Sequence, residues 1–455
     1  MQLQQYYLAC LAHASYLLSD NGEAAVIDPR RDVDIYIEAA AKLGARIKYV
    51  IETHLHADFV SGHRELAART GAQIVLGHRA GAKFPHKAVR DNDVLKLGSA
   101  NLLILETPGH TIESISIVIV DPPAVFTGDT LFIGDVGRPD LDPNHPPRDL
   151  AAMLYQSLHN KLLLLREDVA VYPAHGAGSL CGRAIGEGNS STIGEQKRTN
   201  YACRPMTQDQ FVRIVTADLP ERPAYFTRDV EINRTGAPAL SEMKRVPALS
   251  PILAASRIRN GAAVIDTRSG HQFAAGHIPG SINIGLNGQF AAWAGSLLPG
   301  ERDVILVCEE IDKVEESRLR LVRVGIDKVV GYIAQGLLGW QAEDQPVAQL
   351  PQITAGELVE RFGNYTIVDV RNDSEVAQGV IPGSLNIPLG VLSRRLDRIP
   401  KSKPVLVHCK SGYRASAAAS LLLASGFADV TNLIGGYDAW ALTPSSQSTK
   451  ASSAS

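Results

Sequence analysis

The sequence predicts an α/β protein of three domains, because strands alternate with helices, two linkers divide the chain, and its second half contains a repeat. Its 455 residues suffice for about three domains. Up to about Pro238, apolar strand-like runs alternate with helical stretches such as residues 63–69, which Gly71 closes. Two segments bearing Pro and Ala, residues 236–251 and 342–352, are typical of linkers.

The repeat lies between and beyond these linkers. VIDTRSGHQFAAGHIPGSINI (residues 264–284) is similar to IVDVRNDSEVAQGVIPGSLNI (residues 367–387), and counting back from Gly325 and Gly426 places Cys308 against Cys409. Units of about 100 residues suit a duplicated α/β domain. We therefore expect domains at residues 1–238, 246–343 and 351–443, followed by a Ser-rich tail (444–455) that is expected to be disordered.

Composition limits the function classes. Lys+Arg 45 against Asp+Glu 48 gives a net charge of -3, with no charge block that would bind nucleic acid or an anionic membrane. No window approaches the roughly 20 apolar residues of a spanning helix, and the N-terminus reads as a first hairpin. The scattered cysteines favour a reducing, cytoplasmic setting: Cys10, Cys181, Cys203, Cys308 and Cys409. We also expect a homo-oligomer.

Five ionisable side chains follow predicted strands and indicate a metal centre. They are His54, His56, His110, Asp129 and His175. The strands are expected at residues 47–51, 102–105, 124–126 and 169–172. In an extended THLHAD segment, histidines two residues apart point to the same side, as chelation from one strand end requires.

The order of these residues resembles the metallo-β-lactamase fold superfamily, whose pattern is HxHxDH…H…D…H. The matching residues are His54, His56, Asp58, His110, Asp129 and His175. The resemblance implies an N-terminal αββα sandwich followed by two further α/β domains. Phe59 stands where many members place a histidine for a second metal, so we expect a second metal to bind weakly or not at all.

The spacing and the stretch GDVGRPD (residues 134–140) look like the persulfide dioxygenase branch of that superfamily. The resemblance implies one Fe(2+) per chain, held by His54, His110 and Asp129, a set typical of non-haem iron. It places His56, Asp58 and His175 around these ligands, as supporting groups or alternative metal ligands. His175 as a structural histidine is the alternative. The implied reaction oxidises a low-molecular-weight thiol persulfide, such as glutathione persulfide, to sulfite with O2.

Three further residues lie near these motifs in the sequence and have two possible roles or a role in substrate binding. Arg138 is a candidate partner for a substrate carboxylate, or else a salt-bridge partner within its loop. Tyr172 is a candidate hydrogen-bond donor to substrate. Cys181 is either a reactive thiol or, the preferred interpretation, a small buried hydrophobic residue.

The last repeat contains VLVHC followed by KSGYR and a helical segment, and this looks like the active-site loop of the rhodanese family. Cys409 begins the loop, and Lys410, Arg414 and the helix N-terminus favour its thiolate, which can carry sulfane sulfur as a persulfide. The C-x4-R loop is one residue shorter than that of cysteine phosphatases, which argues against phosphatase activity.

Two other features of the repeats bear on function. Asp369, Arg371 and Glu375 fit the rhodanese strand-end signature, although Val380 replaces a usual histidine, and we expect them to be structural. In the middle copy Cys308 is followed by two glutamates, whose negative charge disfavours a thiolate. We therefore predict a degenerate rhodanese domain with a poor sulfur carrier.

From about Tyr6 to Trp440, the order of domains resembles the fused persulfide dioxygenase–sulfurtransferases of bacterial sulfide detoxification. The resemblance implies that the iron site makes sulfite and that Cys409 passes sulfane sulfur to it, giving thiosulfate, or uses thiosulfate in the reverse direction. One alternative is a glyoxalase-II-like zinc thioester hydrolase with a sulfurtransferase appendage. Another is a non-enzymatic sulfur-binding or sensing protein.

Overall fold

The computed structural model describes residues 1–217, 219, 221–298 and 301–444, which form two compact units. The first unit comprises residues 1–243 with 322–325, and the second comprises 244–321 and the chain from 326 onward. The tail expected to be disordered lies, from residue 445, outside the described residues.

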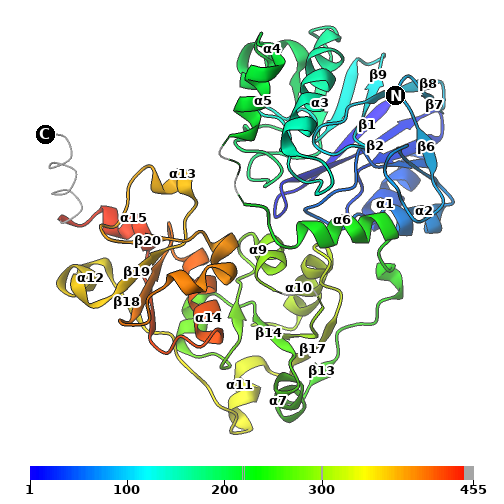
Figure 1. Cartoon of the computed structure of the whole chain (residues 1–455). Helices are drawn as coiled ribbons and strands as arrows, with labels where there is room; N and C mark the ends of the chain where they lie inside the picture. The colour runs from blue at the N-terminus through cyan, green and yellow to red at the C-terminus, as the bar shows by residue number, and fades with distance from the viewer. Residues whose placement is uncertain (218, 220, 299–300, 445–455) are drawn as a thin grey trace, which may run out of the picture. The chain divides into compact units, whose positions relative to one another are not determined.

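The first unit contains two six-stranded sheets (Figure 1). In spatial order, one consists of β1 (Gln2–Leu8), β2 (His13–Asp20), β3 (Glu23–Ile27), β4 (Arg46–Ile51), β5 (Gln73–Gly77) and β6 (Lys87–Val89). The other consists of β12 (Ser191–Thr192), β11 (Ala170–Pro173), β10 (Ala124–Gly128), β9 (Ile115–Ile119), β8 (Ala100–Glu106) and β7 (Val94–Leu97). The antiparallel pairing of β1 with β2 confirms the expected first hairpin.

Helices accompany both sheets. The α-helices are α1 (Asp34–Lys42), α2 (His63–Thr70), α3 (Pro147–His159), α4 (Ile193–Thr199), α5 (Gln208–Thr216) and α6 (Phe226–Thr235). Short 3-10 turns are η1 (Leu162–Leu164), η2 (Tyr201–Cys203) and η3 (Leu240–Glu242). As expected, α2 ends at Gly71, whose left-handed backbone (φ 73°) suits a residue without a Cβ.

Alternating side chains explain the layering. On β2, Tyr16 and Leu18 point into an apolar core shared by both sheets, whereas Leu17 points outward into a core with α1 and α2. On β10, Phe126 joins the core between the sheets, while Val125 packs outward with α3 and α5. Each sheet is thus apolar on both faces and is covered by helices on its outer face, which confirms the αββα sandwich.

Parallel strand pairs gather the site residues at strand ends. β3, β4 and β5 are mutually parallel neighbours, as are β10 and β11. The segment bearing His54 and His56 follows β4, Asp129 directly follows β10, and His175 lies two residues beyond β11. Parallel strands end at one edge of their sheet, and the loops from these edges of the two sheets meet, as the contact between His54 and Asp129 shows.

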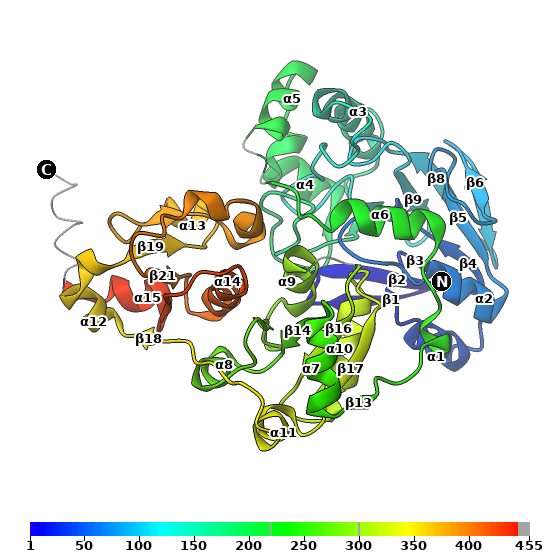
Figure 2. The same ribbon diagram turned by 60° about the horizontal axis from the view of Figure 1, so that its bottom comes forward.

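The second unit contains two five-stranded parallel sheets with the same strand order (Figure 2). The first is β13 (Ala248–Leu249), β17 (Val329–Ile333), β16 (Val304–Val307), β14 (Ala263–Asp266) and β15 (Ile282–Asn283). The second is β18 (Gln352–Ile353), β22 (Val430–Leu433), β21 (Val405–His408), β19 (Thr366–Asp369) and β20 (Leu385–Asn386). This shared topology confirms the duplication.

Each copy has its own helices and apolar core. The middle repeat carries α7 (Pro251–Arg259), α8 (Gly270–Ala275), α9 (Phe290–Leu297), α10 (Asp312–Val322) and α11 (Gly336–Ala342). The last repeat carries α12 (Ala355–Glu360), η4 (Phe362–Asn364), α13 (Asp373–Val376), η5 (Leu389–Arg394), η6 (Leu396–Arg398), α14 (Tyr413–Ala424) and α15 (Gly436–Ala441). In the described part of the chain, no helix has the length and apolarity to cross a bilayer. All five cysteines are free thiols.

Candidate metal centre and sulfur-transfer loop

The fold brings His54, His110 and Asp129 together. Oδ2 of Asp129 lies 3.3 Å from Nε2 of His110 and 3.7 Å from Nε2 of His54. All three side chains are buried, and none of these three atoms has a hydrogen-bond partner among the described residues. Buried polar atoms are rarely left without a partner, so three that converge on one point fit a metal ion.

The contacts of Nδ1 determine the tautomers of His54 and His110. Nδ1 of His110 lies 3.0 Å from the carbonyl oxygen of Arg138, which can only accept. Nδ1 of His54 lies 3.0 Å from Oγ1 of Thr53, whose hydroxyl already donates to Asp28. Both rings therefore carry hydrogen on Nδ1 and direct the lone pair of Nε2 toward Asp129, as metal-binding histidines do.

The charge states suit the same role. Burial lowers the pKa of His54 and of His110, which keeps both rings neutral. Burial alone would raise the pKa of Asp129, but the charged, hydrogen-bonded imidazole of His175 holds it well below its usual range. The cluster thus offers neutral imidazoles and an ionised carboxylate, the states in which these groups bind metals.

His175 lies behind Asp129 and links it to Asp58. Its Nδ1 is 2.8 Å from Oδ1 of Asp129, and its Nε2 is 2.9 Å from Oδ2 of Asp58. Burial would lower its pKa, yet the carboxylates of Asp129 and Asp58 raise it well above the ordinary value, so that the ring carries a charge between them. This arrangement orients Asp129 through the oxygen that does not face His54 and His110.

His56 packs beside His54, with ring centroids 4.1 Å apart, and its Nε2 lies near two carboxylates that the sequence analysis missed. Its Nε2 lies 3.1 Å from Oδ1 of Asp28 and 3.5 Å from Oε2 of Glu52, and both carboxylates are buried. Asp28 directly follows β3, the parallel neighbour of β4. Since polar residues that directly follow neighbouring parallel strands lie close together, the sequence could have identified Asp28 as a site residue. Glu52 directly precedes the THLHAD motif.

Phe59 is buried against His56, with ring centroids 4.4 Å apart. His56, Asp58 and His175 offer ligand atoms within 4.8 Å of one another, where a second ion would find donors. The Phe59 ring adds no donor there, since it is wholly hydrocarbon.

The three weaker candidates lie in different surroundings. Arg138 is buried and paired through two nitrogens with Asp140, at 2.6 and 2.9 Å, which is the loop salt bridge of the alternative interpretation. The Tyr172 ring packs in the core between the sheets, 5.3 Å from Phe126. Cys181 is buried close to Asp129, and burial raises the pKa of its thiol well above the usual value.

The Cys409 loop follows β21 and leads into α14. The backbone amide of Gly412 lies 3.1 Å from Sγ of Cys409, where it stabilises negative charge on sulfur. Arg414 forms a two-point ion pair with Glu375, at 2.6 Å for each contact, and Lys410 is exposed. The structure therefore brings the amide to the sulfur and anchors Arg414 on a carboxylate.

The middle repeat differs at the equivalent loop. Cys308 is buried, and burial raises the pKa of its thiol. Arg268 pairs with Asp266 at 2.5 Å in this repeat as Arg371 pairs with Asp369 at 2.6 Å in the last. Because this ion pair occurs in both copies, we infer that it stabilises the end of the strand and does not depend on the sequence of the cysteine loop.

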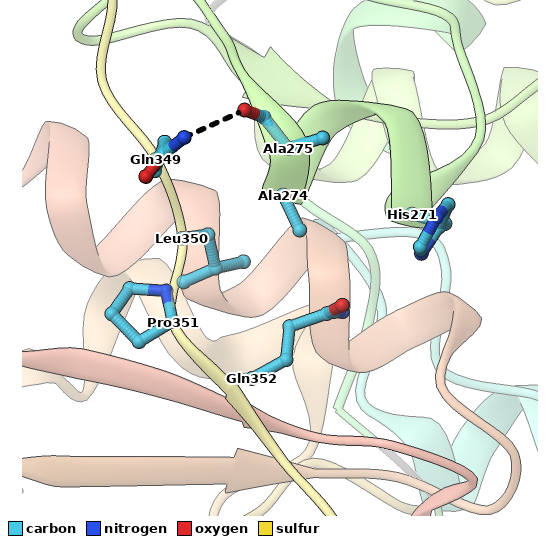
Figure 3. Close-up of a pocket in the computed structure, with 7 residues that line it drawn as sticks. All are labelled: His271, Ala274, Ala275, Gln349, Leu350, Pro351 and Gln352. Carbon is cyan, nitrogen blue, oxygen red and sulfur yellow. Dashed lines mark hydrogen bonds between the residues drawn. The ribbon is translucent and has the colours of Figure 1, made fainter.

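A cavity of about 300 Å³ lies in the second unit, and its lining carries neither a cysteine nor a carboxylate (Figure 3). Its residues are His271, Ala274, Ala275, Gln349, Leu350, Pro351 and Gln352. The Gln349 amide donates to the carbonyl of Ala275 across one edge.

Comparison with known proteins identifies both kinds of domain. The profile of the metallo-β-lactamase superfamily matches residues 8–175, and that of the rhodanese-like domain matches residues 250–343 and 354–443. A probable metallo-hydrolase of Burkholderia pseudomallei is 32% identical over 259 residues, covering 48% of this chain and 86% of the relative. The mitochondrial persulfide dioxygenase ETHE1 of Homo sapiens is 31% identical over 221 residues, covering 47% and 80%.

Among solved structures, a metallo-β-lactamase of Staphylococcus aureus has a TM-score of 0.67 and 32% identity, covering 73% of this chain and 98% of that one. The chain belongs to the metallo-β-lactamase superfamily. More specifically, it joins a metallo-β-lactamase domain homologous to persulfide dioxygenases to two rhodanese-like domains. The fusion expected from the sequence is confirmed.

Proposed function

We propose that the first unit is an iron persulfide dioxygenase that converts RSSH, O2 and water into RSH and sulfite. The observation that carries the proposal is the convergence of two imidazole nitrogens and one carboxylate oxygen that lack other partners. This is the donor set of facial-triad Fe(2+) sites. The resemblance to persulfide dioxygenases supports the substrate class, of which glutathione persulfide is an example.

In this proposal the chain's own residues hold the ligands in place. His54, His110 and Asp129 would bind one Fe(2+), which would supply the electron transfer between persulfide sulfur and O2. Thr53 and the carbonyl of Arg138 orient the imidazoles, while His175 fixes the carboxylate. His56 and Asp58 belong to the supporting groups. Substrate contacts of Arg138 and Tyr172 remain predictions.

We propose sulfur transfer at Cys409 as the second activity. Its thiolate attacks a sulfane sulfur, displaces the donor thiol or sulfite, and becomes a persulfide; sulfite or another acceptor then removes that sulfur and restores the thiolate. With sulfite as acceptor the product is thiosulfate, and the same steps reversed consume it. Gly412 N supports this role by facing Sγ, and Lys410 and Arg414 are the proposed cationic partners.

One observation favours a second candidate for the first unit, a glyoxalase-II-like thioester hydrolase. His56, Asp58 and His175 lie close enough to hold a second ion, and one relative is a probable metallo-hydrolase. Phe59 weighs against it because it supplies no ligand.

Metal analysis of the full chain after anaerobic purification, followed by oxygen uptake with glutathione persulfide, tests the first activity. We expect iron near one per chain and oxygen uptake that depends on persulfide. Two zinc ions per chain with hydrolysis of a glutathione thioester, and no oxygen uptake, would contradict the dioxygenase.

A thiosulfate:cyanide sulfurtransferase assay tests the second activity. Cys409→Ser should abolish it, because serine cannot carry sulfane sulfur, whereas the matched Cys308→Ser should retain it. Unchanged activity in Cys409→Ser would refute the assignment.

We also propose that the protein is cytoplasmic and that it forms a homo-oligomer.

A further inference from the structure

Helix α14 of the last repeat is bonded to the middle repeat of the same compact unit. The Ser416 hydroxyl donates to Oδ1 of Asn283 at 2.6 Å, and the backbone N–H of Asn283 donates to Oγ of Ser420 at 2.9 Å. All three residues are buried. A methyl group added at Gly270 would lie 3.0 Å from Ser416, so the two segments approach closely.

The sulfur-transfer loop itself also reaches the middle repeat. Tyr413, which lies between Gly412 and Arg414, donates from its hydroxyl to the carbonyl of Gly285 at 2.7 Å. A Cβ on Gly288 would lie 2.5 Å from the Tyr413 ring, which therefore packs directly on backbone. Burial raises the pKa of Tyr413, so the phenol keeps the proton that it donates.

Comparison of equivalent asparagines shows what the middle repeat has gained. Asn386 in the last repeat donates to the carbonyls of Asp369 and Arg371, at 3.0 and 2.9 Å. Asn283 makes the same two bonds within its own repeat, at 3.0 and 2.9 Å, and in addition accepts from Ser416. The middle copy thus keeps this strand-end asparagine although its cysteine loop has diverged.

We propose that the middle repeat is a positioning element for sulfur transfer, with Asn283 and Tyr413 as the positioning residues. The inference rests on the sulfur-transfer activity proposed for Cys409. The first turn of α14 directly follows Gly412, whose amide faces the sulfur. Anchoring Tyr413 and Ser416 on the middle repeat fixes where that amide and the positive end of the helix lie. The degenerate domain therefore contributes to the reactivity of a cysteine that it does not contain.

The pH dependence of Cys409 alkylation in the full chain tests this role. The probe is iodoacetamide, and mass spectrometry of the Cys409 peptide separates its rate from those of the other thiols. Ser416→Ala and Tyr413→Phe each remove one cross-repeat hydrogen bond and little else. We expect the alkylation profile to shift to higher pH, and kcat/KM for thiosulfate to fall about two- to tenfold, the range that one hydrogen bond supports.

Ser425→Ala is the matched control, since this serine lies at the end of α14 and its hydroxyl bonds to Leu421 of its own helix. It should leave the profile unchanged. In an Asn283→Ala background, Ser416→Ala should cause no further shift, because the two act through one bond. Profiles identical to that of the unmodified protein in both Ser416→Ala and Tyr413→Phe would overturn the inference. Absence of sulfur transfer in the unmodified protein would instead refute the proposed function. The pH dependence of Cys409 alkylation in the variants would still test whether the middle repeat positions the loop.

Discussion

Nδ1 of His175 lies 2.8 Å from Oδ1 of Asp129, and this bond leaves Oδ2 of the carboxylate facing His54 and His110. One oxygen is therefore used for orientation and the other is available to a metal. We therefore expect His175 to influence metal binding through the orientation of Asp129 and not as a ligand itself.

His175→Ala should weaken iron binding without abolishing it. Loss of a hydrogen-bonding partner of a ligand typically costs about 10–100-fold in metal affinity, because the carboxylate is no longer held in one orientation. Competition between the protein and a chelator measures the change. His271→Ala, an exposed histidine in the other unit, is the control. Iron affinity equal to that of the unmodified protein would show that His175 does not orient Asp129.

Phe59→His should create a second metal site. The new imidazole would lie beside His56, whose ring centroid is 4.4 Å from that of Phe59, near the potential ligands Asp58 and His175. With zinc in the medium, we expect the metal content to rise from about one to about two ions per chain. Phe59→Leu, which adds no donor, should leave the content unchanged. A content of one ion in Phe59→His would show that this residue does not limit the number of metals.

Gly137→Ala should disrupt the metal centre through backbone contact. A Cβ at this position would collide with the carbonyl oxygen of Asp129 and lie 2.8 Å from Nδ1 of His110. Displacing both ligands should lower iron content and oxygen uptake by at least about tenfold. Gly390→Ala is the control, because nothing lies within 4 Å of its added Cβ. Full iron content in Gly137→Ala would contradict the close packing.

Acid should destabilise β21 through His408. Burial lowers the pKa of this histidine from its ordinary 6.5 to about 4. Between these pH values the unfolded chain binds a proton that the folded chain does not, so stability falls as the pH decreases from 6.5 and levels off below 4. The loss is up to about 3 kcal/mol.

Hydrogen exchange of the β21 peptide at pH 7 and pH 5, corrected for intrinsic rates, measures this effect. His408→Gln should flatten the dependence, since its side chain does not titrate. The same loss of protection in both proteins would assign the acid sensitivity to other groups.

The order of strands and ligands was predictable from local patterns. The apolar runs that precede THLHAD and TGD can be recognised in the sequence alone. The structure places both motifs at strand ends, where His54 and Asp129 meet. The duplication could also be recognised in the sequence, because the two copies of the domain have the same residue types at equivalent strand ends. These features depend on residues close in sequence, so local spacing predicts them.

Other parts of the site depend on residues far apart in the chain. The sequence analysis did not identify Asp28 and Glu52. Their contacts with Nε2 of His56 depend on how neighbouring strands pack. The bond between Ser416 and Asn283 joins residues 133 positions apart. No periodicity or motif encodes such a contact.

The sequence by itself determined the α/β class and the repeat, and it predicts the ligand types and the reactive cysteine, since chemistry and short-range pattern suffice for these. The tertiary structure decided which imidazole nitrogens face Asp129, which carboxylate oxygen has no hydrogen-bond partner, and which residues of the middle repeat contact the Cys409 loop and α14. These depend on side-chain directions that are set only when separate strands and helices pack against one another.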